Sequence, residues 1–592
     1  MEMMTGGGGS VPKAKLDDDQ EAAEREPWLL AATASGGHAP ERETKGKEQW
    51  RRVLFIGCLV TLPLIAFFIL GRESASAVFQ IASAKLTSFN GASGLTTNAS
   101  QCHHDGVSKK KVVDELLGGL LPPNMDRRTC RSRYESSQYY KHFPYAASPY
   151  LLSKLRAYEA RHRRCAPGTP LYAKAIDQLR SNPNRSVEST ECRYIVWLPF
   201  DGLGNRMLSM VSGFLYALLT DRVLLVDLPQ DSSDLFCEPF PGATWLLPPE
   251  FHGVVGLDLF RLGPSPDISY TSLVASNRIK NATVATPAYV YLSLGYQMTD
   301  GLFFCGDDQR ELAKVNWLLL YSDLYFVPSM YAVAEFNDEF RRMFPGEFKE
   351  SACHLLARYL LHPTNAVWGM VTRYYDTYLA GSDRRIGVQI RMFGFGSIPV
   401  NDMYNQILAC SRQEHVFPET TDDDDDQDVA TTPNSNNNNS TAVAILIASL
   451  YPDYYERIRA TYYEHAAKGG VRVGVFQPTH EERQATQMLF HNQKALAEIY
   501  LLGFCDELVT SGMSTFGYVG SSLAGVRPAI LLPAHGHKVP ATPCRRAVSM
   551  EPCNLTPPRV EMECRGKAVD KEDLARHVKV CEDYDKGVKF FD

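Results

Sequence analysis

Apolar residues in the N-terminal half of the chain fall into short continuous runs separated by a stretch of helical spacing. The run at 193–200 is followed by a glycine-containing turn, by apolar residues at helical spacing over 207–220, and by a second run at 221–228. This order of apolar run, turn, amphipathic helix and second run is typical of a strand–helix–strand unit. We therefore predict two parallel strands joined by a helix here.

The C-terminal half repeats the pattern with more strands. We expect strands at 385–393, 441–449, 471–478, 507–511 and 527–533, with helices at 452–468, 481–504 and 518–525. Strands that alternate with helices favour parallel α/β sheets. Two such halves predict an α/β fold of two Rossmann-like lobes that face each other across a cleft, with ligands at the carboxyl ends of the strands.

A longer apolar run precedes both halves. Residues 53–71 contain no charged side chain, and about 20 apolar residues cross a bilayer as a helix. Four basic residues lie just before the run: Lys45, Lys47, Arg51 and Arg52. The positive-inside rule therefore places the N-terminus in the cytoplasm and the long C-terminal part in the lumen. The alternatives are a buried core helix and a cleaved signal peptide, and the polar segment 1–52 disfavours the second.

These patterns divide the chain into six segments. They are a disordered cytoplasmic tail over 1–52, a transmembrane anchor over 53–71, a stem over 72–110, an N-terminal lobe over 111–380, a C-terminal lobe over 381–545, and a final segment over 546–592 that packs back near the cleft. The tail and the Ser-, Ala- and Gly-rich stem lack a periodic apolar pattern, which is typical of disordered and linker segments.

The C-terminal lobe carries a low-complexity insertion at 419–441, with the sequence ETTDDDDDQDVATTPNSNNNNST. Consecutive aspartates and asparagines cannot form a core, so we predict a surface loop. The alternative is a DxD metal site, but a flexible acidic run lacks the rigid geometry that Mg²⁺ requires. We therefore expect no metal here.

Charge and cysteine content narrow the possible functions. A net charge of −7 over 592 residues gives no basic surface typical of nucleic-acid binding. Cys58 lies in the long apolar run, and the other thirteen of the fourteen cysteines follow it without paired CxxC units. This scatter excludes a zinc module and fits disulfides in an oxidising compartment. Because thirteen is odd, at least one cysteine is free or pairs between chains.

N-glycosylation triplets agree with a lumenal location. The candidates are Asn98, Asn184, Asn281, Asn438, Asn439 and Asn554. Each triplet also arises by chance, and Pro557 weakens the last one further.

The turn between the first predicted strand and its helix reads DGLGNR, from Asp201 to Arg206. Gly202 and Gly204 allow the backbone to turn tightly and to approach a ligand closely. The free N–H groups at the start of the following helix attract an anion. The third glycine of a GxGxxG motif is absent, so a plain strand-to-helix turn is the alternative interpretation.

Polar residues also follow strands of the C-terminal half. Arg391 ends the first of them, where a guanidinium suits bidentate binding of a diphosphate; a surface ion pair is the alternative. His480 follows the third strand and either contacts phosphate or base or is simply solvated. The segment TSGMSTFG, residues 510–517, places hydroxyl and N–H groups at a helix start, although Ser514 could be only the helix cap.

Together these segments resemble the plant cell-wall fucosyltransferase family, whose best-known member is xyloglucan fucosyltransferase. The resemblance covers roughly residues 145–592 and is carried by DGLGNRMLSMVSGFLYALLTDRVLLVD, DLFCEPFPGATWLLPPEF, LLYSDLYFVPS, LLHPTNAVWGMVTRYY, RIGVQIRMF, ELVTSGMSTFGYVGSSLAG and MEPC. It implies a GT-B-variant glycosyltransferase fold, with the acceptor side in 111–380 and the GDP-fucose site in 381–545. It also implies metal-independent, inverting transfer of L-fucose from GDP-fucose, typically to a galactose 2-hydroxyl of a cell-wall glycan.

The resemblance implies roles for single residues as well. Arg391 matches the arginine that holds the donor diphosphate. The segment beside the nucleotide is matched by Ser514, Thr515 and Phe516, and the glycine loop near the reaction centre by Gly202, Gly204, Asn205 and Arg206. Asp300 and Asp583 match acidic positions, and we expect Asp300 first and Asp583 second to remove the acceptor proton. Either could instead be only an ion-pair partner. The insertion has no counterpart in the family.

The sequence leaves the acceptor open. Arabinogalactan protein and arabinosylated xylan are alternatives to xyloglucan, and a catalytically silent Golgi scaffold is the alternative from another class. Retention of Arg391 and the STFG segment argues against the scaffold. The expected location is the Golgi membrane, with a single-pass type II topology and a lumenal catalytic body. The protein could act alone, as a homodimer, or in a complex with other glycosyltransferases.

Overall fold

A computed structural model describes the chain from residue 114 onward, with gaps. The described residues are 114–140, 146–187, 190–255, 268–278, 286–295, 298–393, 397–421, 441–558, 563–564, 567–568 and 576–591. All of them belong to the second of two units, Lys110–Asp592. The predicted tail, anchor and stem lie outside the described residues. Within the described ranges, no helix combines the length and apolar character needed to cross a membrane.

The first sheet has four parallel strands in the order β2-β1-β4-β3. Its strands are β1 (Tyr194–Leu198), β2 (Val223–Val226), β3 (Tyr289–Leu294) and β4 (Trp317–Ser322). The predicted strand–helix–strand unit is confirmed as β1, α5 (Leu203–Thr220) and β2, with Tyr194 opposite Val223. Nearly every strand residue is buried, as expected for a parallel sheet with helices on both faces.

The second sheet has six strands in the order β10-β9-β8-β5-β6-β7. Its strands are β5 (Arg384–Ile390), β6 (Ala442–Ser449), β7 (Arg472–Phe476), β8 (Glu507–Ser511), β9 (Ala529–Leu531) and β10 (Cys544–Arg546). All pair in parallel except β10, which runs antiparallel to β9. The five runs predicted as strands are therefore confirmed, and the predicted helices correspond to α14 (Pro452–Glu464), α15 (Leu489–Leu502) and α16 (Thr515–Ala524).

The remaining helices, turns and hairpins complete the fold. The remaining helices are α2 (Arg131–Glu135), α3 (Pro149–Cys165), α4 (Pro170–Ser181), α6 (Glu250–Val255), α7 (Tyr270–Ala275), α8 (Gly306–Leu312), α9 (Ala334–Met343), α10 (Ala352–Leu360), α11 (Asn365–Tyr374) and α12 (Val400–Glu414). The 3₁₀ and π turns are η2 (Ser136–Gln138), η4 (Met298–Phe304), η5 (Pro328–Ala332), η6 (Gly346–Ser351), η7 (Tyr375–Leu379) and η9 (Lys468–Gly470). Two small hairpins pair β11 (Glu563–Cys564) with β12 (Lys567–Ala568), and β13 (Val578–Val580) with β14 (Val588–Phe590).

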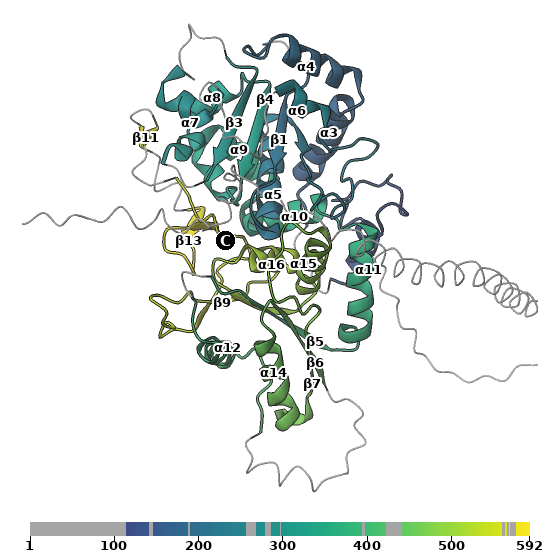
Figure 1. Cartoon of the computed structure of the whole chain (residues 1–592), viewed down its shortest axis with the longest axis vertical. Helices are drawn as coiled ribbons and strands as arrows, with labels where there is room; N and C mark the ends of the chain where they lie inside the picture. Colours follow the sequence, from purple (N-terminus) through teal and green to yellow (C-terminus); the bar gives the residue numbers. More distant parts are fainter. Residues whose placement is uncertain are drawn as a thin grey trace, which may run out of the picture. The chain divides into compact units, whose positions relative to one another are not determined.

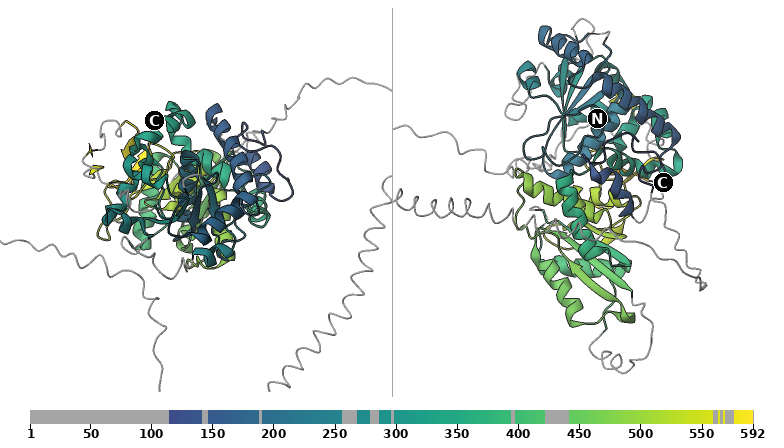
Figure 2. Two further views of the ribbon diagram at one scale, coloured as in Figure 1. Left: turned by 90° about the horizontal axis from the view of Figure 1, so that it is seen from above. Right: turned by 90° about the vertical axis from the view of Figure 1, so that its right-hand side faces the viewer.

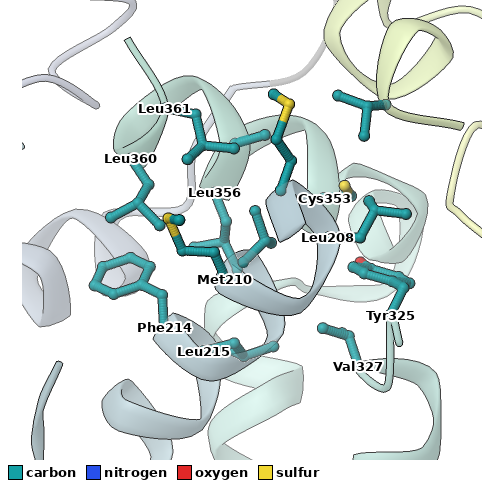
Figure 3. Packing of buried hydrophobic residues seen from close by; sticks show 14 of the residues in the cluster. Leu208, Met210, Phe214, Leu215, Tyr325, Val327, Cys353, Leu356, Leu360 and Leu361 are labelled. Atoms are coloured by element: carbon teal, nitrogen blue, oxygen red, sulfur yellow. The ribbon is translucent and has the colours of Figure 1, made fainter. Parts of the chain in front are cut away.

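A layer of helices joins the two sheets into one hydrophobic core. Figure 1 shows α5, α10, α15 and α16 between the sheets, and the right view of Figure 2 shows the blue and teal elements on one side of this layer and the green ones on the other. Figure 3 shows Met210 and Phe214 of α5 near Leu356 and Leu360 of α10, and all four are at most 1% exposed. Burial of each such side chain stabilises the fold by roughly 1.5–3 kcal/mol.

Helix α16 is held at its C-terminal end by side chains of α10. Arg358 donates from Nε and Nη2 to Leu523 O at 3.2 and 2.8 Å, and His354 Nδ1 lies 2.7 Å from Ser522 O. The positive charge of Arg358 complements the negative end of the helix dipole, whereas burial lowers the pKa of His354 well below its usual value and keeps the imidazole neutral. The guanidinium stays cationic although burial lowers the pKa of Arg358 to about 10.

Five disulfides cross-link the described part of the chain. They are Cys130–Cys237, Cys165–Cys192, Cys305–Cys564, Cys410–Cys544 and Cys553–Cys581. Cys353 and Cys505 are buried and lie outside these bonds, and Cys102 is not among the described residues. Disulfides form and persist in oxidising environments, and the location of the protein stays a prediction.

The insertion is narrower than the predicted 419–441. Backbone hydrogen bonds join Thr421 N to Ala466 O and Lys468 N to Glu419 O. Residues 419–421 therefore belong to the folded surface beside α14, and the aspartate and asparagine tracts lie within 422–440, outside the described residues.

A buried carboxylate of the C-terminal segment joins elements that are far apart in the sequence. Glu551 is 1% exposed; its Oε1 accepts a hydrogen bond from Cys353 N of α10 (2.7 Å), and its Oε2 accepts one from the Tyr325 hydroxyl (2.5 Å). Burial raises the pKa of Glu551 to about 8.

This pKa predicts a pH-dependent stability. An unfolded glutamate titrates near 4.5, so between that pH and about 8 unfolding releases a proton from this group. Its contribution is fully present below pH 4.5 and is lost as the pH rises through about 8, at about 1.4 kcal/mol per pH unit. We expect Glu551→Gln to flatten the fall in the urea midpoint between pH 5 and 8. The exposed control Glu456→Gln on α14 should keep the wild-type slope, and an equal slope in both variants would contradict this assignment.

Candidate active site

Two helices begin face to face at the carboxyl ends of their strands. Helix α5 follows β1 and has Gly202 at its N-cap, and α16 follows β8 and has Ser514 at its N-cap. A Cβ atom on Gly204 would lie 2.7 Å from Thr515 Oγ1 and 2.8 Å from Phe516 N. No side chain fits at that distance, so glycine is required for the two helix starts to touch. Their free N–H groups and positive dipole ends then share one region, which suits an anion.

The glycine loop is braced by its own polar side chains. Asp201 adopts a φ of +59°, and Asn205 Nδ2 donates to its carboxylate at 2.6 Å. Arg206 donates to Asp201 O and to Ser232 Oγ, and forms an ion pair with Asp231 at 2.8 Å. The Arg206 guanidinium is thus engaged by protein groups. In this conformation Arg206 stabilises the loop. An anion at the two helix starts would therefore be bound by backbone N–H groups and by residues other than Arg206.

Arg391 reaches the glycine loop through Gln484. Its backbone N donates to Ser511 Oγ at 2.9 Å, which ties the end of β5 to the end of β8. Its Nη2 donates to Gln484 Oε1 at 2.7 Å, and Gln484 Nε2 lies 3.3 Å from the Cβ position of Gly202. The predicted arginine, glycine loop and STFG segment are therefore brought together.

Asp583 positions the start of α16. Its Oδ2 accepts hydrogen bonds from Met513 N at 2.7 Å and from the Tyr518 hydroxyl at 2.6 Å. Met513 has a φ of +57°, and a Cβ on Gly512 would lie 2.9 Å from Asp583 Cβ. Burial, followed by the nearby carboxylate, raises the pKa of Tyr518 well above its usual value, so the tyrosine stays a donor. In the structure Asp583 therefore supports a loop.

Asp300 lies after β3, on the side of the first sheet. It is buried, and its Oδ2 accepts a hydrogen bond from Gly295 N at 2.8 Å. Burial first, then Asp308 and, as a smaller cause, Asp300 raise the pKa of Tyr270 well above its usual value. Parallel strands end at one edge of a sheet, so Asp300 shares the carboxyl edge of the first sheet with the glycine loop.

An aromatic and acidic group that the sequence pattern did not indicate lies at the same edge. Phe200 after β1 stacks on Tyr321 of β4 at 4.4 Å, and burial, then Asp323 and Asp201, raise the pKa of Tyr321. Two carboxylates thus lie near one aromatic pair, an arrangement that suits a sugar ring and its hydroxyls. The stretch LLYSDLYF carries the signal, but β4 was not predicted as a strand.

His480 lies at the surface beside α14. It is exposed and lies edge-on to Tyr455 of α14 at 5.8 Å. This contact places it beside the helix that follows β6, and its predicted role toward the nucleotide stays a prediction.

One group in the described residues combines three possible metal ligands, namely Cys553, Cys581 and Asp583. Both sulfurs are joined in a disulfide, so they cannot act as thiolate ligands. Asp583 already accepts two hydrogen bonds. This group therefore does not form a metal centre.

The glycosylation candidates differ in exposure. Asn184 is exposed, whereas Asn554 is fully buried and its Nδ2 donates to Ser329 Oγ at 2.6 Å. The prediction for Asn554 is therefore wrong for the folded chain, because no glycan fits at a buried, hydrogen-bonded nitrogen. Four candidates lie outside the described residues: Asn98, Asn281, Asn438 and Asn439.

Comparison with known proteins agrees with this geometry. The profile of the xyloglucan fucosyltransferase family matches residues 90–565. The chain belongs to this family. It is 43% identical to the galactoside 2-alpha-L-fucosyltransferase of Pisum sativum over 82% of this chain and 84% of that protein. It is 45% identical to the probable fucosyltransferase 8 of Arabidopsis thaliana over 84% of this chain and 93% of that protein.

A solved structure matches the fold. It is that of an arginine-to-lysine mutant of Arabidopsis thaliana FUT1 in complex with GDP, with a TM-score of 0.71 and 43% identity. The match covers 81% of this chain and 100% of that chain. The fold is thus the mixed α/β glycosyltransferase fold with parallel sheets, and this family member is a fucosyltransferase.

The contact at Gly204 gives a direct test. Gly204→Ala would push a methyl group against Thr515 and the backbone of Phe516, so the helix starts must separate. We expect kcat/KM for the donor to fall about tenfold or more, equivalent to ~1.4 kcal/mol, with a lower melting temperature. Gly253→Ala on α6, where a Cβ meets nothing within 4 Å, is the matched control. Wild-type activity and melting in Gly204→Ala would show that the helices need not touch.

Proposed function

We propose that this fucosyltransferase transfers L-fucose from GDP-fucose, with inversion, to a galactose hydroxyl of a cell-wall glycan such as xyloglucan, forming an alpha-1,2 linkage. The observation that carries the donor assignment is the meeting of two helix N-termini beside Arg391. The names of the relatives and the GDP in the related solved structure support the choice of sugar and nucleotide.

The charges at the site suit a leaving diphosphate. Arg391 Nη2 donates to the neutral amide of Gln484, which leaves its positive charge available to an anion. The starts of α5 and α16 add free N–H groups from two directions. Negative charge grows on the diphosphate as the glycosidic bond breaks, and fixed donors aimed at such charge stabilise the transition state. The matched segment Ser514–Phe516 would then lie beside the nucleotide.

The acceptor hydroxyl needs a proton acceptor late in an inverting displacement. Asp201, Asp300 and Asp323 follow β1, β3 and β4 and share one edge of the first sheet. We propose Asp300 as the base. Asp583, the second candidate, already uses Oδ2 to hold the loop before α16, so we assign it a supporting role.

One labelling assay distinguishes xyloglucan from the alternative acceptors. The purified protein is incubated with GDP-[¹⁴C]fucose and with xyloglucan, arabinogalactan protein or arabinosylated xylan, each with and without EDTA. We expect label in xyloglucan, released by an alpha-1,2-fucosidase, and no loss of rate with EDTA, since the proposal includes no metal. Label in another glycan would change the acceptor, loss of rate with EDTA would refute metal independence, and no transfer to any acceptor would favour the silent scaffold.

The cellular location and membrane topology are proposed from the sequence alone. The uncharged run 53–71 and the basic residues before it support a Golgi type II anchor with a lumenal catalytic body. Protease added to sealed Golgi vesicles should remove only the segment before residue 53, and digestion of the catalytic body from outside would contradict this topology.

Arg391 provides the sharpest test of the donor site. Lysine keeps the charge but cannot reproduce the two parallel N–H donors of a guanidinium. We expect kcat/KM for GDP-fucose to fall about tenfold or more in Arg391→Lys, and further in Arg391→Ala, with nearly unchanged melting. Arg459→Ala on the exposed face of α14 serves as a control for loss of an arginine. Near-wild-type rates in a folded Arg391→Ala protein would refute the donor-site assignment.

A further inference from the structure

The loop between β7 and α15, residues 477–488, links the second sheet to the proposed donor site. Gln484 near its end bonds to Arg391 and lies against Gly202. Asn492 Nδ2 donates both to Thr486 O of the loop, at 2.6 Å, and to Asp231 O, at 2.9 Å. The path of this loop therefore determines where Gln484 meets Arg391.

One buried carboxylate fixes the start of the loop. Glu498 of α15 is 7% exposed, and the Thr479 hydroxyl donates to its Oε1 at 2.5 Å. The backbone of Thr479 makes a second hydrogen bond to the same carboxylate. An ionised carboxylate accepts at both oxygens, whereas a protonated one must use one oxygen as a donor. Hydrogen bonds to an ionised acceptor are also stronger than those to a neutral one, so the charged form holds Thr479 more tightly.

The groups that face Glu498 come from three elements. Glu481 of the loop raises the pKa of Glu498, and Lys494 of α15 lowers it. Glu498 in turn lies close enough to Tyr374 of α11 to raise the pKa of that tyrosine, after burial and Tyr378. Lys494 is itself bound to Glu481, which also pairs with His491. Burial is the largest effect and raises the pKa of Glu498 to about 7, so its charge changes near neutral pH.

We propose that Glu498 is a positioning residue: its carboxylate holds Thr479 and thereby the loop that brings Gln484 to Arg391. The proposal rests on the proposed function in that Arg391 is taken to bind the donor diphosphate. Protonation of Glu498 removes one acceptor and weakens the hold on the start of the loop, so donor binding weakens as the pH falls.

The test uses the full-length protein and substitutions that barely change volume. Glu498→Gln leaves one acceptor and adds an N–H donor opposite Thr479. We expect its KM for GDP-fucose to rise about tenfold, while kcat changes less than about twofold. In the wild type KM should fall as the pH rises from 5.5 to 8, whereas in Glu498→Gln it should stay high across this range. Glu482→Gln, an exposed carboxylate of the same loop, is the matched control and should keep the wild-type profile.

A second variant tests the contact itself. Thr479→Val removes only the hydroxyl and should raise KM in the same direction, and Thr479→Val combined with Glu498→Gln should be no worse than Glu498→Gln alone, because both break one interaction. If Glu498→Gln fails to fold, the pH profile of Thr479→Val decides the question. A wild-type KM and pH profile in the folded variants would overturn the proposal.

Amide hydrogen exchange separates this inference from the proposed function. Without any ligand, residues 477–488 should exchange faster in Glu498→Gln than in the wild type at pH 7.5, and faster in the wild type at pH 5.5 than at 7.5 after correction for the intrinsic rate. Failure of the wild type to bind GDP or GDP-fucose would refute the proposed function, whereas the exchange result would still stand. Equal exchange in wild type and Glu498→Gln would refute the role of Glu498.

Discussion

The close contact between the starts of α5 and α16 is the constraint on which the rest of the structure depends. Gly204 lets α5 approach the backbone of Thr515 and Phe516. At the next residue of α16, a Cβ on Gly517 would lie 2.8 Å from Gln389 Oε1 and 2.9 Å from Thr510 Cβ. Helix α16 is thus held against α5 on one side and against the second sheet on the other. Because neither glycine tolerates a side chain, the two sheets can pack in this way only with these residues.

The remaining supports of α16 come from distant parts of the chain. Arg358 and His354 of α10 hold its C-terminal carbonyls, and Asp583 fixes the loop at its N-terminus. Asp583 is itself anchored, two residues after the Cys553–Cys581 disulfide. A helix fixed at both ends presents its N–H groups without having to reorganise when charge develops, which is the physical basis of electrostatic preorganisation. Arg391 lies beside this helix start, where its backbone N donates to Ser511 Oγ and its guanidinium donates to the neutral amide of Gln484.

Much of the fold could be predicted because its strands and helices are locally distinct. β1, β2 and the strands β5 to β9 of the second sheet are apolar runs separated by clear turns or by long helices, whereas the short β10 (CRR) gave no apolar signal. β3 and β4 were missed, since only the short elements η4 and α8 lie between them and no long amphipathic helix marks the crossover. With β4 missed, the carboxylate of Asp323 and the stacked pair Phe200–Tyr321 could not be placed. Arg206 was expected to face the ligand, but its partner Asp231 lies in a separate loop.

The sequence by itself determined β1, β2, β5 to β9 and most of the helices between them, the glycine loop, and the family, because each depends on residues that are close along the chain or on motifs of fixed spacing. It also singled out Arg391 at the end of β5. Only the tertiary structure decided which of these meet. The tertiary structure brought Gly204 against Thr515 and buried Asn554. It also placed Asp583 to accept a hydrogen bond from Met513 N, and Glu498 to accept one from the Thr479 hydroxyl. Such contacts depend on how two sheets pack through one layer of helices. Distances of a few ångströms between side chains on different elements are set by that packing and leave no periodic trace in the sequence.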